Sequence, residues 1–89
     1  MMLKNDFVLR QVAQTWIVLP LAEETVNLSG ILTLNDSGAM LWKCMEQGAN
    51  QEDLVKALTD EYIVSYEQAA ADVAEFLEKL IQAGCVRKD

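Results

Sequence analysis

The amino-acid sequence predicts an α+β domain in which N-terminal strands are followed by three helices. Before Asn35, the chain contains short runs of β-branched and aromatic residues. After Asn35, apolar residues recur at helical spacing. Because 89 residues leave room for one core, we expect residues 1–89 to form a single domain.

The first two predicted strands cover residues 7–13 and 15–19. Only a short link around Ala13 and Gln14 separates them, which favours a hairpin. The second run is apolar on both faces, as is typical of a central strand, and Pro20 predicts its end because proline cannot donate a ladder hydrogen bond. A short apolar segment, residues 26–28, and a turn signal at Ser29-Gly30 then precede the last strand, residues 31–34.

Each predicted helix has recognisable ends. Polar cap residues precede all three helices, and a glycine follows the first and the third. Ser65 and Gln68 have the spacing of a capping box, and Val64 with Ala69 that of a hydrophobic staple. The caps are Asn35-Asp36-Ser37, Asn50 and Ser65, and the glycines are Gly48 and Gly84.

The helical apolar positions predict the core. In the first helix they lie within residues 39–45, with Trp42 as an aromatic anchor, although a ligand-stacking role for Trp42 stays open. In the second helix they are Leu54, Val55, Leu58 and Tyr62, and in the third Ala69, Ala70, Val73, Phe76, Leu77, Leu80 and Ile81. Strands followed by three short helices predict a compact domain of winged-helix type.

Charge and hydropathy restrict the possible partners. The net charge is −7 and the seven cations are scattered, which argues against a nucleic-acid partner. No apolar run reaches the roughly 18–20 residues of a membrane span, so we expect no membrane partner. The first residues carry no signal-peptide pattern, and we therefore expect a cytoplasmic protein.

The residue types argue against catalysis and metal binding. The chain contains no histidine, so the commonest general base is missing. Cys44 and Cys85 are far apart and lie among apolar neighbours, which predicts reduced core residues, with a disulfide as the alternative. The acids of the last helix, Glu67, Asp72, Glu75 and Glu78, are typical of a solvated face. We accordingly expect no enzyme, no cofactor and no metal.

Several fragments together resemble PqqD-like proteins. The segment Leu34-Asn35-Asp36-Ser37-Gly38 followed by Trp42 is similar to the family's "Leu-Asn-x-[Ser/Thr]-[Gly/Ala]…Trp" pattern. Phe7-Val8-Leu9-Arg10 is similar to its start, although Gln14 stands where the family often has a glycine in the hairpin. The matching end comprises Tyr62, Ala69, Asp72, Val73, Phe76, Leu77, Leu80 and Gly84, so the resemblance extends over about residues 7–86.

The resemblance implies a winged-helix-like fold with an N-terminal three-stranded antiparallel sheet followed by three helices. It also implies a recognition element for ribosomally made, post-translationally modified peptides. Such modules bind the leader of a precursor peptide and present it to a modifying enzyme, often a radical S-adenosylmethionine enzyme. The founding member serves the synthesis of pyrroloquinoline quinone, whereas the loose similarity of the N-terminal half favours another peptide pathway here. The leader adds as a strand beside the third helix, which implies peptide-binding residues at Ile31, Leu32, Thr33, Leu34, Asp72, Val73, Phe76, Lys79 and Leu80, some of which must also face the core.

Two other functions remain open from the sequence. Winged helices commonly bind DNA, but the third helix carries four acids and only Lys79 among cations. A structural subunit could instead pair with itself through the edge strand at residues 31–34, because an open edge can join a second copy as a homodimer.

Overall fold

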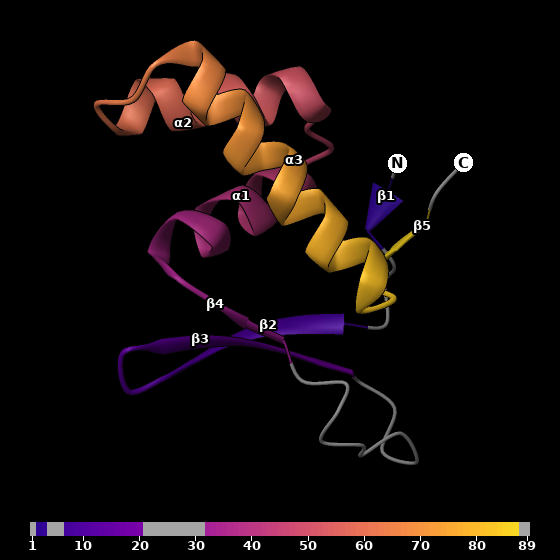
Figure 1. Cartoon of the computed structure of the whole chain (residues 1–89). Helices are drawn as coiled ribbons and strands as arrows, with labels where there is room; N and C mark the ends of the chain where they lie inside the picture. The colour runs from indigo at the N-terminus through magenta and orange to yellow at the C-terminus, as the bar shows by residue number, and fades with distance from the viewer. Residues whose placement is uncertain (1, 4–6, 21–31, 88–89) are drawn as a thin grey trace.

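The computed structural model describes residues 2–3, 7–20 and 32–87. Three helices lie on one side of a three-stranded sheet, and a two-stranded ribbon stands beside them (Figure 1). The α+β prediction is therefore confirmed, and the winged-helix description is compatible with this arrangement. The predicted apolar segment at residues 26–28 and the edge residue Ile31 lie outside the described residues.

The larger sheet has the strand order β2-β3-β4 and is antiparallel throughout. Its strands are β2 (Phe7–Val12), β3 (Thr15–Pro20) and β4 (Leu32–Leu34). The strand ending at Pro20 is central, as its apolar character predicted. Leu9, Val18 and Leu32 stand in register across the three strands, and Val18 is completely buried in the core.

The hairpin between β2 and β3 contains an unfavourable residue. Ala13 adopts a φ of 57°, which places an L-residue with a Cβ in the left-handed region. Val12 pairs with Thr15, so Ala13 and Gln14 form a two-residue loop whose first residue has positive φ. Turns of this kind favour glycine at that first position.

We therefore expect Ala13→Gly to stabilise the fold by about 0.5–1 kcal/mol, since glycine adopts positive φ without a Cβ clash. Thermal unfolding followed by circular dichroism measures the change. Gln14→Gly is the matched control, because Gln14 has no positive φ and gains no such relief. A melting temperature that falls in Ala13→Gly would show that the loop is not strained at this residue.

The helices α1 (Asp36–Glu46), α2 (Gln51–Glu61) and α3 (Tyr66–Gln82) begin at the predicted caps. Gly48 and Gly84 follow α1 and α3 with φ of 94° and 77°, as C-terminal stops do. The predicted capping box at Ser65 forms only in part. Ser65 accepts the backbone N–H of Gln68, but the Gln68 side chain does not accept the Ser65 backbone N–H in return and donates to Asp72.

The complete capping box lies at α2, where Asn50 and Asp53 each accept the other's backbone N–H. An acidic residue at the third helical position suits this role, because its carboxylate both accepts the cap N–H and complements the positive end of the helix.

The core lies between the sheet and the helices. Trp42 is 1% exposed and anchors it, while its indole N–H donates to Glu46 at 3.2 Å. Cys85 is fully buried, and Cys44 packs partly buried against the same cluster, so both lie where core residues were predicted. Tyr62 corrects the core prediction: it follows the last residue of α2 and its side chain is 43% exposed.

The sequence did not predict a small two-stranded ribbon beside the helices. Strand β1 (Met2–Leu3) pairs antiparallel with β5 (Val86–Arg87), so residues from both ends of the chain lie side by side (Figure 1). Leu3 and Val86 pack against the core. Two-residue strands carry too little alternation to be recognised before their partner is known.

Candidate functional site

The site begins with an open strand edge. Strand β4 is last in the order β2-β3-β4, and its residues Leu32, Thr33 and Leu34 pair with Val18, Ile17 and Trp16 of β3. Among the described residues, no strand pairs with the other edge of β4. Alternate backbone N–H and C=O groups of such an edge point outward and can bind an extended chain.

The junction of β4 and α1 shapes the floor beside this edge. The Asn35 side-chain oxygen accepts the Gly38 N–H at 2.8 Å and the Ser37 hydroxyl at 2.9 Å, which caps α1 directly after the strand. A Cβ on Gly38 would stand 3.2 Å from the Asn35 oxygen and 3.3 Å from Leu34 Cβ. Glycine therefore permits the close approach between the helix start and the strand.

Helix α3 forms the opposite wall. Asp72, Glu75, Phe76 and Lys79 follow helical spacing and lie on one face of the helix. Phe76 belongs both to this face and to the core, with 7% of its side chain exposed. Lys79 lies 4.0 Å from Glu75, which pairs the single cation among the described residues of this helix with an acid.

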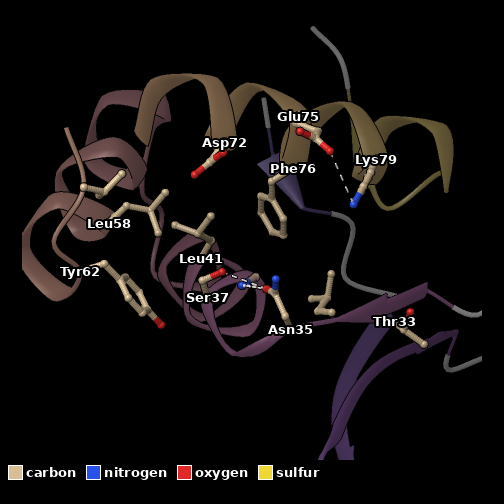
Figure 2. A pocket seen from close by; sticks show the side chains of 13 residues that line it. Thr33, Asn35, Ser37, Leu41, Leu58, Tyr62, Asp72, Glu75, Phe76 and Lys79 are labelled. Carbon is tan, nitrogen blue, oxygen red and sulfur yellow. Dashed lines mark hydrogen bonds and ion pairs between the residues drawn. The ribbon is translucent and has the colours of Figure 1, made fainter. Parts of the chain in front are cut away.

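Between these walls lies a groove of about 440 Å³ (Figure 2). Its central lining is apolar, while amide, hydroxyl and charged side chains line the rims. We call this the β4–α3 groove, defined by the residues Thr33, Leu34, Asn35, Ser37, Gly38, Leu41, Leu58, Tyr62, Val64, Asp72, Glu75, Phe76 and Lys79. Its dimensions and lining suit an extended apolar segment with a few polar contacts.

Only some of the peptide-binding residues that the resemblance implies line this groove. Thr33, Leu34, Asp72, Phe76 and Lys79 line it, although they come from two segments far apart in the sequence. The others take different positions. Leu32 packs partly buried against the core, Val73 and Leu80 are completely buried, and Ile31 lies outside the described residues.

Burial of Val73 and Leu80 has a simple geometric reason. These residues share the helix face of Ala69 and Leu77, which turns towards the core, whereas Asp72, Glu75 and Lys79 stand on the neighbouring face. A bound peptide would therefore meet Val73 and Leu80 only through the residues that cover them.

The far end of the groove was not identified from the sequence. Leu58, Tyr62 and Val64 lie there and come from the end of α2 and the link to α3. Figure 2 shows Leu58 and Tyr62 at the end near Asp72, and Thr33 at the end near Lys79. The resemblance pattern included Tyr62 without a role, and helical spacing placed it in the core.

No group of three or more cysteine or acidic residues is arranged to hold a metal ion in residues 2–3, 7–20 and 32–87. Within the same ranges, none of the helices is both long and apolar enough to cross a membrane.

Comparisons with known proteins point to one family and one fold. The family model of coenzyme PQQ synthesis protein D (PqqD) matches residues 16–86. The fold is similar to that of "TbiB1 in Complex with the TbiA(beta) Leader Peptide", with a TM-score of 0.80 and 22% identity over 100% of this chain and 98% of the other. No curated protein matches the sequence.

A second solved structure has the same fold. It is "Lasso peptide synthetase B1 complexed with the leader peptide", with a TM-score of 0.77 and 22% identity over 97% of this chain and 95% of that one. Both of these similar proteins were therefore solved with a leader peptide bound.

Proposed function

Because the chain belongs to the PqqD family, we propose that it is a non-catalytic adaptor that binds the leader of a ribosomally made precursor peptide. The bound leader is presented to a modifying enzyme, of the radical S-adenosylmethionine type. The observation that carries this proposal is the open edge of β4 directly beside the β4–α3 groove. An extended peptide can satisfy the backbone groups of the edge while its side chains enter the groove.

Backbone pairing and side-chain contacts have different roles in this mode of binding. Hydrogen bonds to β4 hold any extended peptide, because every residue except proline offers both a donor and an acceptor. Selection then comes from the groove, whose apolar floor at Leu34, Leu41 and Phe76 receives alternate side chains of the added strand.

The thermodynamics of leader binding suit an adaptor that must later release its peptide. A leader that is disordered in solution loses conformational entropy when it docks, which lowers the affinity below what the contacts alone would give. The complex can therefore form, deliver the precursor and dissociate. The modifying enzyme acts on the precursor while the leader stays bound, and the adaptor itself supplies no catalytic group.

Titration with synthetic leaders tests this proposal. Leaders of small peptides encoded near the gene are added to isotope-labelled protein, and amide shifts are followed by NMR. We expect saturable shifts in β4 and at Asp72, Glu75 and Lys79. Glu78 and Gln82, which are exposed on α3 but do not line the groove, are the internal control and should shift little.

Silence with every leader in a folded sample would overturn the adaptor function. The open edge of β4 also allows pairing with a second copy, which is the other use of the same backbone groups. Sedimentation at increasing protein concentration distinguishes the two. An adaptor stays monomeric or loses its self-association when a leader binds, whereas a self-pairing subunit dimerises whether or not a leader is added.

A further inference from the structure

The charges that line the β4–α3 groove are unevenly distributed. Two acids, Asp72 and Glu75, and one cation, Lys79, line the groove. The Lys79 ammonium lies 4.0 Å from the Glu75 carboxylate. Asp72 forms no ion pair within the described part of the chain. Its carboxylate instead accepts a hydrogen bond of 2.9 Å from the Gln68 amide, which fixes its position without neutralising its charge.

An aromatic side chain stands at the same end of the groove. Figure 2 shows the Asp72 carboxylate pointing into the groove on the side where Tyr62 lies. The Tyr62 side chain is 43% exposed, so its ring is available to a ligand. A carboxylate and an aromatic ring together favour a cation, and a planar guanidinium most of all, because it can both pair with the acid and stack on the ring.

The opposite end of the groove does not offer this environment. Thr33 and Lys79 lie there, and the ammonium group of Lys79 disfavours a second cation. Asp72 and Lys79 are two turns of helix apart, or about 10 Å along the axis. A strand covers that distance in about three residues.

We propose that the groove selects leaders with an arginine or lysine that lies between Asp72 and Tyr62, about two or four residues from the peptide residue beside Lys79, because only an even spacing directs both side chains of a strand into the groove. This inference rests on the proposed function, since it assigns the chemistry of the peptide that the groove binds. The net charge of −7 acts in the same direction, because the field of the whole protein attracts a cationic segment during diffusion.

A random library of short peptides displayed on phage tests the inference without knowledge of the natural leader. The protein is immobilised through its C-terminus, and phage that survive washing are sequenced. We expect the selected peptides to share an arginine or lysine at a fixed distance from apolar residues of strand-like alternation. A synthetic peptide of the selected consensus is then compared with its version that carries glutamine in place of the cation.

Paired variants of the protein connect the preference to Asp72. Asp72→Asn should weaken binding of the consensus peptide about twofold to fivefold, the effect of one exposed ion pair. Glu78→Gln removes the same charge from the same helix outside the groove and should leave binding unchanged. Asp72→Lys should prefer a consensus peptide whose cation is replaced by glutamate. Raising salt from about 0.05 to 0.5 M should reduce the difference in affinity between the native protein and the Asp72→Asn variant.

The outcomes distinguish a failure of this inference from a failure of the proposed adaptor function. If no selected peptide shifts the amide signals of β4, both the adaptor function and the inference fail. If peptides bind at β4 without a shared cation, or if Asp72→Asn and Glu78→Gln have equal effects, the adaptor function stands and the inference is overturned.

Discussion

Thr33→Pro is expected to abolish leader binding, because proline removes a backbone donor and fixes φ near −65° in the middle of the three-residue edge strand. Loss of two or three edge hydrogen bonds, at about 0.5–1.5 kcal/mol each, would weaken the complex roughly fivefold to two-thousandfold. Thr33→Ala keeps the N–H and the strand geometry and is the matched control. Isothermal titration calorimetry measures both affinities.

A change of fold must be separated from a loss of binding. The proline could disturb the pairing of β4 with β3, since Thr33 stands opposite Ile17. Circular dichroism melts show whether the variant remains folded. A second measurement leaves the protein unchanged: successive amides of the peptide are N-methylated one at a time. Strand addition predicts weaker binding at every second position, by about tenfold, because alternate amides point towards β4. Equal effects at neighbouring positions would exclude strand pairing.

Local chemistry made much of this fold predictable. The caps at Asn35, Asn50 and Ser65 were recognisable because an N-cap depends on a side chain and a backbone N–H only three residues apart. The stops at Gly48 and Gly84 were equally local, since each needs positive φ at one residue. Such features survive any arrangement of the helices around them.

Features that depend on distant partners were not predictable in the same way. The ribbon of β1 and β5 joins residues near opposite ends of the chain. Neither strand has a pattern of its own, so their pairing arises only from the packing of the whole domain.

The groove was predictable only in part, because it depends both on local sequence and on packing between distant segments. The resemblance implied Thr33, Leu34, Asp72, Phe76 and Lys79, and these line it. Helical spacing placed Val73 in the core and Asp72 on a solvated face, whereas the resemblance implied both for peptide binding. Which exposed residues of α3 line the groove depends on how the helix is rotated against the sheet. The end of α2 contributes residues to the groove because the helix ends just before Tyr62, and the position of that end is likewise a result of packing.

Phe76→Ala is expected to cost about 3–5 kcal/mol of stability, because Phe76 is 7% exposed and belongs to the hydrophobic core. A domain of this size has roughly 4–13 kcal/mol in total. The variant is therefore expected to be marginally folded, and its failure to bind a leader would say nothing of the groove. Denaturant unfolding measures the loss, and a change below about 1 kcal/mol would contradict the core role of Phe76.

A pair of milder changes separates stability from recognition. Phe76→Leu and Leu77→Met alter adjacent buried residues with small volume changes, and each should cost less than about 1.5 kcal/mol. Of the two residues, Phe76 alone lines the groove. If its ring forms the floor on which a leader side chain packs, Phe76→Leu weakens binding while Leu77→Met does not. Equal binding by both variants would mean that Phe76 supports the groove through the core alone, and that recognition lies with the edge of β4 and the groove rims.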